Sequence, residues 1–169
     1  MAVSLRLEVK QKDAKKIITW LEDKNITQYL NEDINSIDSI QQVINRNQSD
    51  LLTFYLNQDG RFFLIDLDQE CIGFINLFTI RKNKEYEVVI AIGEEDKWGK
   101  QYAKHALEQI LREVFFEWRI ERIQAKICTE NARSIGLFTH LNFQEKQEND
   151  KLLIYSLDFD SYLDYLHGF

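Results

Sequence analysis

The chain has 169 residues, of which 44% are hydrophobic and 29% charged, and its formal net charge is −7. This composition is ordinary for a globular protein, and the acidic surplus disfavours nonspecific binding to nucleic acid while mildly favouring a cationic partner. The sequence has no apolar run near the roughly 20 residues that cross a bilayer, and its first residues lack the apolar core of a signal peptide. We therefore expect one cytoplasmic domain over residues 1–169, without a membrane anchor.

The cysteines and histidines give no sign of a disulfide or a metal centre. Cys71 and Cys128 lie in apolar, strand-like runs, which predicts two buried free thiols. The three histidines do not pair with one another or with a cysteine at metal-ligand spacing. We expect no metal site.

The first part of the chain combines one strand with several helices. Alternating apolar residues predict a strand over residues 4–9, and Asp13 is a candidate N-cap for the helix that follows. After a break within residues 20–35, a second helix is predicted from apolar residues at helical spacing, which are Ile37, Ile40, Val43 and Ile44. Residues 49–58 fit a short helix and a strand equally well.

From Arg61 the apolar pattern changes to that of strands. Residues 61–67 and 71–80 flank the turn sequence Asp68-Gln69-Glu70, which predicts an antiparallel hairpin. A turn at residues 82–84 leads to a third strand over residues 86–92. Because side chains alternate along a strand, one face of it should carry Glu87, Val89 and Ala91.

The second half alternates helices and strands. An amphipathic helix begins near Ala103, and a fourth central strand follows over residues 120–128. A helix over residues 131–141, with Ile135, Phe138 and Leu141 inward, precedes a closing strand over residues 151–157. Residues 159–166 suggest a last amphipathic turn or two. The order β-α-α-β-β-β-α-β-α-β predicts a mixed α/β sheet with one crossover helix.

The junction between the third of these strands and the crossover helix is a candidate anion site. The first N–H groups of a helix have no intrahelical partner, so a basic loop that leads into a helix can bind a phosphate. The loop and the helix start carry four basic residues, Lys97, Lys100, Lys104 and His105. The alternative is a plain connection with a solvated lysine cluster.

The segment EVVIAIGEEDKWGKQYA (residues 87–103), followed by ENARSIGLFTHLNF (residues 130–143), resembles the GNAT superfamily of acyl-CoA-dependent N-acetyltransferases. It is most similar to the branch that contains ribosomal-protein-alanine, spermidine and aminoglycoside acetyltransferases, and the similarity spans nearly the whole chain. The resemblance implies a mostly antiparallel central sheet with splayed central strands and flanking helices. Members of this branch often pair their subunits, which leaves a homodimer open here.

The resemblance also implies a binding site for acetyl-CoA. The family's pyrophosphate motif, Arg/Gln-x-x-Gly-x-Gly/Ala, falls on Trp98, Gly99, Lys100, Gln101, Tyr102 and Ala103. Gln101 replaces the central glycine, and a glutamine can direct its backbone N–H at a phosphate if its φ stays negative. The pantetheine arm is expected along the preceding strand, and the matching contacts there and on the later helix are Ile90, Ala91, Ile92, Asn131, Ser134 and Phe138. Asn131 equally fits an ordinary N-cap.

Two residues bear on catalysis. Phe138 stands where many relatives have a tyrosine that protonates the CoA thiolate; phenylalanine has no proton to give, and water could deliver it instead. Glu87 matches a glutamate that is common in this branch and is our candidate base, because an alkyl ammonium with a pKa of about 10.4 must lose a proton before it attacks. A solvated glutamate at a strand end is the alternative. Weaker candidates are Tyr86, Cys128, Ser134 and His140.

The expected reaction is acetyl transfer from acetyl-CoA to a primary amine by direct attack within a ternary complex. The expected acceptor is a polyamine, an aminoglycoside or a protein N-terminus. The region between the first two helices carries acidic residues that suit a cation, namely Glu22, Asp23, Glu32 and Asp33. Solvated surface charge is the commoner reason for such residues. A non-catalytic CoA-binding or regulatory protein on the same fold is the alternative, with Gln101 and Phe138 as signs of lost activity.

Overall fold

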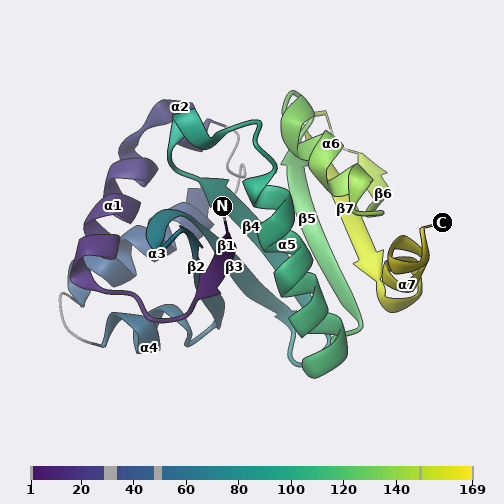
Figure 1. Ribbon diagram of the computed structural model, residues 1–169, viewed down its shortest axis with the longest axis horizontal. Coiled ribbons are helices and arrows are strands. Elements are labelled where there is room, and N and C mark those ends of the chain that lie inside the picture. Colours follow the sequence, from purple (N-terminus) through teal and green to yellow (C-terminus); the bar gives the residue numbers. More distant parts are fainter. Residues whose placement is uncertain (1, 29–33, 48–50, 149, 169) are drawn as a thin grey trace.

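The computed structural model in Figure 1 describes residues 2–28, 34–47, 51–148 and 150–168. The strands are β1 (Val3–Arg6), β2 (Gly60–Leu67), β3 (Glu70–Arg81), β4 (Glu85–Ile92), β5 (Arg122–Cys128), β6 (Gln144–Glu148) and β7 (Leu152–Asp158). The helices are α1 (Gln11–Glu22), α2 (Lys24–Thr27), α3 (Ile34–Arg46), α4 (Leu52–Leu56), α5 (Tyr102–Arg112), α6 (Ala132–His140) and α7 (Phe159–His167). A 3₁₀ turn, Glu95–Lys97, precedes α5, and a π-helical turn, Glu113–Glu117, extends it.

The strands form one seven-stranded sheet in the order β1-β2-β3-β4-β5-β7-β6. The pair β4–β5 is parallel and the other neighbours are antiparallel, because α5 carries the chain from the end of β4 back to the start of β5. This arrangement confirms the predicted mixed α/β sheet with one crossover helix. None of the described helices is long and apolar enough to cross a membrane.

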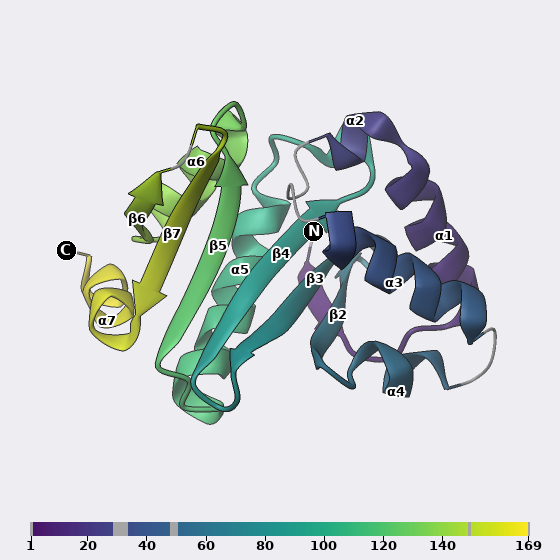
Figure 2. The ribbon, with the colours of Figure 1, turned by 180° about the vertical axis from the view of Figure 1, so that it is seen from behind.

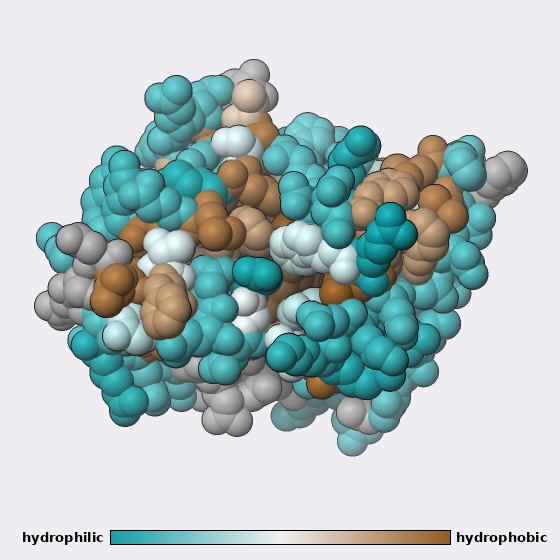
Figure 3. Space-filling view, turned by 90° about the horizontal axis from the view of Figure 1, so that it is seen from below, coloured by the Kyte–Doolittle hydropathy of each residue, from teal (hydrophilic) through white to brown (hydrophobic). Residues whose placement is uncertain are grey.

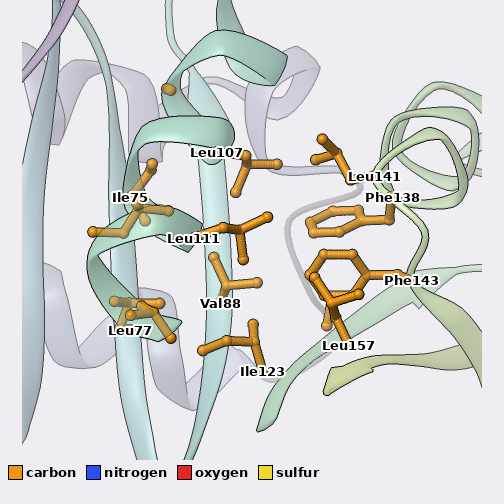
Figure 4. Packing of buried hydrophobic residues seen from close by; sticks show 14 of the residues in the cluster. Ile75, Leu77, Val88, Leu107, Leu111, Ile123, Phe138, Leu141, Phe143 and Leu157 are labelled. Carbon is orange, nitrogen blue, oxygen red and sulfur yellow. The ribbon is translucent and has the colours of Figure 1, made fainter. Parts of the chain in front are cut away.

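Each face of the sheet has its own apolar core. On one face α5 and α6 pack on the central strands, and Figure 4 shows Leu107 and Leu111 of α5 above Val88 and Ile123. On the opposite face, α1, α3 and α4 cover β2 and β3 around Ile17. Figure 2 shows α3 and α4 on this second face and leaves β5 and β7 in open view. The second face therefore has a covered half and an uncovered half.

An ion-pair network joins the first strand to this second core. The sequence had suggested Asp13 as the N-cap of α1, but Lys10 holds that position. The Asp13 carboxylate instead accepts a hydrogen bond from the Lys10 backbone N–H at 2.9 Å and pairs with Arg6 at 2.8 Å. Arg6 also pairs with Asp66 on β2 at 2.7 Å. The guanidinium thus ties β1, α1 and β2 together.

Three other expectations need correction or completion. The ambiguous segment at residues 49–58 contains the helix α4. β6 was not expected, because its sequence QEKQE has no apolar alternation; it is an edge strand that pairs with β7 on one side. Cys71 is buried as predicted, whereas Cys128 is only half-buried.

The surface carries several large apolar side chains apart from the cores. Figure 3 shows the face seen from below, where small apolar patches lie among hydrophilic residues. The large apolar residues exposed on the described part of the chain are Leu7, Leu51, Phe54, Ile80, Phe116, Phe159 and Leu166.

The central strands β4 and β5 part from each other halfway along. They pair through Glu85 with Arg122, Tyr86 with Ile123 and Glu87 with Gln124. Beyond Glu87, β4 continues on β3 as far as Ile92, while β5 continues on β7 as far as Cys128. This fork confirms the splayed central strands that the family resemblance implied.

Candidate active site

A cavity of about 420 Å³ lies where β4, the loop that follows it, α2, α5 and α6 meet. Its walls include many of the residues predicted to bind acetyl-CoA, which are Ile90, Ala91, Ile92, Trp98, Gly99, Gln101, Tyr102, Ala103 and Asn131. Three predicted residues, Lys100, Ser134 and Phe138, do not line it. Its walls also contain Lys97 and Lys104, which the sequence had indicated as basic residues of an anion site, and His140, a weaker catalytic candidate. The residues that the sequence missed are Asn25, Ile26, Arg133, Gly136 and Leu137. Helical spacing along α6 could have signalled the last three.

The loop before α5 turns through two left-handed residues. Gly99 has a φ of +73°, and Gln101, the N-cap of α5, has a φ of +66° and a ψ of 14°. The condition of a negative φ, under which Gln101 could direct its backbone N–H at a phosphate, is therefore not met. The extended chain at Trp98 must reverse sharply to start the helix, and a non-glycine residue pays about 1–2 kcal/mol for this conformation. Gln101 thus has a left-handed backbone at the position where the family motif has its central glycine.

The electrostatic character of the cavity is opposite to that of the chain. Lys97, Lys104, Arg133 and His140 line it, and the described lining residues include no aspartate or glutamate. The whole sequence, by contrast, has 28 acidic and 21 basic residues apart from histidine. The start of α5 adds the positive end of the helix dipole. These features together suit an anion, and phosphate in particular.

Two contacts organise the mouth of this cavity. Trp98 donates a hydrogen bond from Nε1 to the backbone carbonyl of Ile92 at 2.8 Å. Its ring faces Arg133, whose guanidinium carbon lies 4.0 Å from the ring centroid. The end of β4 and the first turn of α6 are therefore connected through the indole.

Asn131 is the N-cap of α6, as predicted. Its Oδ1 accepts a hydrogen bond from the Ser134 backbone N–H at 3.1 Å, and its Nδ2 donates one to Ser134 Oγ at 2.9 Å. Asn131 is buried and borders the cavity. Ser134 therefore orients Asn131 rather than lining the cavity itself.

Phe138 lies in the core instead of the cavity wall. It is buried and packs edge-on against Phe143, with a centroid separation of 4.9 Å (Figure 4). The cavity side of α6 is formed by Arg133, Gly136, Leu137 and His140, which recur at helical spacing. Phe138 falls on the opposite stripe, so the placement of this residue at the cofactor needs correction.

Glu87 occupies the fork itself. It is the last residue of β4 that pairs with β5. It is only 6% exposed, which rules out the alternative of a solvated glutamate at a strand end. Its Oε1 lies 3.1 Å from Nζ of Lys126 on β5. By strand alternation Glu87 shares a face with Ala91, which packs in the core beneath α1 and α3. Glu87 is thus on the side of the sheet opposite α5.

The remaining candidates are scattered. Glu22 and Asp23 are exposed, and Asp23 caps α2 by accepting the Asn25 backbone N–H at 2.9 Å. Glu32 and Asp33 lie outside the described residues. Tyr86 is buried in the α5 core, whereas His140 is exposed at the cavity.

The comparison with protein families decides the identity. The model of the family described as Acetyltransferase (GNAT) domain matches residues 4–144. The chain belongs to the GNAT acetyltransferase family. It is accordingly an acyl-CoA-dependent N-acetyltransferase with acetyl-CoA as its cosubstrate, as the sequence predicted.

Relatives and solved structures agree with this assignment. This GNAT chain is 28% identical over 140 residues to the N-acetyltransferase p20 of Bacillus licheniformis, covering 79% of this chain and 75% of p20. It is 27% identical over 136 residues to the prophage-derived N-acetyltransferase YokL of Bacillus subtilis, covering 72% and 76%. The structure of spermidine N-acetyltransferase from Vibrio cholerae with CoA and spermine has the same fold, with a TM-score of 0.74, 21% identity and coverage of 95% and 98%.

Proposed function

We propose that this GNAT enzyme acetylates a primary amine of a small cationic molecule, such as a polyamine or an aminoglycoside, with Glu87 as the base. The observation that carries the proposal is the ion pair at the fork. Lys126 already places an alkyl ammonium 3.1 Å from the buried Glu87 carboxylate. The same carboxylate can therefore hold the ammonium of an acceptor and take its proton through water. A protein N-terminus remains a second class of acceptor.

The cosubstrate is proposed to lie along the fork and in the basic cavity. Beyond Glu87, the edge of β4 that faces β5 pairs with no strand in the described part of the chain, so those backbone groups of residues 90–92 that point to this edge are available to a bound chain such as pantetheine. The first turn of α5 would then receive the pyrophosphate, with Gly99 and Gln101 shaping the loop that leads into it. Asn131 borders the same cavity from the side of α6.

The reaction follows from direct attack. The neutral amine nitrogen adds to the thioester carbonyl carbon, and the oxyanion that forms can be stabilised by a backbone N–H of β4. The C–S bond then breaks, the attacking nitrogen gives up its surplus proton to form the N-acetyl product, and the departing thiolate takes up a proton. Because Phe138 is buried in the core and has no acidic hydrogen, this proton is assigned to water.

A turnover assay tests the acceptor class. Acetyl-CoA is incubated with a panel of polyamines, aminoglycosides and peptides with free N-termini, and release of CoA thiol is followed together with the mass of the product. We expect saturable release with a small cationic amine. Turnover with peptides alone would reject the proposed acceptor. Binding of acetyl-CoA without turnover on any amine of the panel would likewise reject it.

A further inference from the structure

We infer that Arg133 is a phosphate-binding residue of the acetyl-CoA site and that Trp98 is its positioning residue. This inference rests on the proposed cosubstrate site, to which it adds a residue that the family motif does not mark. Arg133 lines the basic cavity from α6, across from Trp98 in the loop that follows β4. The observations that carry it are a stacking contact, a hydrogen bond and the local distribution of charge.

The guanidinium of Arg133 is held by a ring rather than by a carboxylate. Its carbon lies 4.0 Å from the Trp98 centroid, well within the distance at which cations bind aromatic faces. Among the described residues, no acidic side chain forms an ion pair with Arg133. Arg61 and Arg112 also contact rings without an ion pair in the described part of the chain, but of these three only Arg133 lines the cavity. In a chain with a net charge of −7, this leaves the charge of Arg133 for another anion.

The contact with the ring also leaves the N–H donors of the Arg133 guanidinium available to an anion. A guanidinium that lies against a ring keeps its N–H donors in its own plane, at the edge of the stack, where they can meet two oxygens of one phosphate. Lys97 and Lys104 line the same cavity from the opposite side, together with the start of α5. A phosphate in the cavity would therefore be contacted from both the loop and α6.

Trp98 is itself fixed in place. Its Nε1 donates to the Ile92 carbonyl at 2.8 Å, so the indole is anchored to the last residue of β4. The ring cannot turn without breaking this hydrogen bond, and it therefore restricts where the Arg133 side chain can go. Such preorganisation reduces the rotamer entropy that binding would otherwise cost. Trp98 accordingly acts on the phosphate through Arg133.

The test compares a donor that has phosphates with one that has none. Binding of CoA and of pantetheine, which lacks the pyrophosphate and the nucleotide, is measured by calorimetry for the wild type, Arg133→Met, Arg133→Lys and Trp98→Leu. We expect Arg133→Met to weaken CoA binding about 10- to 100-fold, the effect of losing charge-assisted hydrogen bonds, and to leave pantetheine binding unchanged. Arg133→Lys should lie between, because it retains the charge but not the planar donor pair.

A double-mutant cycle tests the role of Trp98. Trp98→Leu should weaken CoA binding in the wild-type background and have a much smaller effect when Arg133 is already methionine, because the two residues act as a unit. Arg61→Met is the matched control, since Arg61 stacks on Trp118 at 5.6 Å outside the cavity and should not alter CoA binding. Unfolding curves verify that each variant is folded; should Arg133→Met not fold, Arg133→Lys carries the comparison.

Two results would overturn the inference. One is CoA binding by the Arg133 variants equal to that of the wild type, and the other is an equal loss for CoA and pantetheine, which would indicate a general disturbance of α6. A wild-type protein that fails to bind CoA would instead count against the proposed cosubstrate site itself, so the two failures are distinguishable.

Discussion

Glu87 on β4 and Lys126 on β5 form an ion pair of 3.1 Å at the point where the two strands separate. The pair bridges the fork on the face opposite α5. Glu87 is 6% exposed, while the side chain of Lys126 remains 30% exposed. Because the lysine stem is flexible and reaches solvent, the ammonium can leave the carboxylate when another cation arrives.

Replacing the carboxylate should lower the rate of acetyl transfer. Glu87→Gln keeps the size and hydrogen-bonding capacity of the side chain but cannot accept a proton, so kcat should fall about 10²- to 10⁴-fold. The loss should be greatest near neutral pH and shrink at alkaline pH, where more of the acceptor is already neutral. Steady-state kinetics across pH measure this. Glu85→Gln, two residues earlier on β4 and paired with Arg81 and Arg122, is the control. A Glu87→Gln enzyme with an unchanged pH–rate profile would remove Glu87 from the base role.

Removing the ammonium should favour the acceptor. In Lys126→Met the cationic substrate no longer competes with an internal lysine, so its KM should fall several-fold while kcat changes little. The same variant should be less stable without ligand, by about 1–3 kcal/mol, because a mostly buried carboxylate loses a charged partner. Chemical denaturation with and without the amine measures both effects, and added amine should restore more stability to the variant than to the wild type. A raised KM would show that Lys126 assists the acceptor instead of competing with it.

The left-handed glutamine at the start of α5 should limit stability. Gln101→Gly removes the steric cost of a φ of +66°, and after subtraction of the extra chain entropy of glycine it should raise the free energy of unfolding by about 0.5–1 kcal/mol. Gln101→Ala keeps the steric cost and should stay near the wild type. Urea unfolding at equilibrium compares the three proteins. Equal stability of the glycine and alanine variants would indicate that the backbone at this position relaxes.

The network around Arg6 should control stability in acid. Burial by itself would raise the pKa of Asp13, but hydrogen bonds from the Arg6 guanidinium and the Lys10 backbone outweigh it and hold this pKa below its usual value. The carboxylate therefore stabilises the fold above its unfolded pKa of about 3.9, and this contribution is lost as pH falls through the lower, folded value. Arg6→Met removes the positive charge that pairs with the Asp13 carboxylate. The variant therefore loses this stabilisation, and its acid unfolding should begin at a higher pH. Circular dichroism between neutral and acidic pH would follow it, and coincident acid transitions in both proteins would contradict the assignment.

Much of the fold could be read from local patterns. Alternation marked the hairpin of β2 and β3 and the two faces of β4, and helical spacing marked α1, α3, α5 and α6, because these periods are properties of consecutive residues. β6 escaped because an edge strand of polar residues has no such period. Asn131 was recognisable as an N-cap because its partner, Ser134, lies one turn away.

The sequence by itself determined the order of the elements apart from α2, α4 and β6, the basic loop before α5 and the motif residues that indicate a GNAT enzyme. Only the tertiary structure decided that Gln101 is left-handed, that Phe138 turns into the core, that Arg133 meets Trp98 and that Glu87 meets Lys126. The physical reason is the range of the interactions. Periodicity and caps depend on neighbours within a turn or two. The contacts of Arg133 with Trp98 and of Glu87 with Lys126, by contrast, join residues far apart in the sequence, and they exist only when the sheet and its helices are assembled.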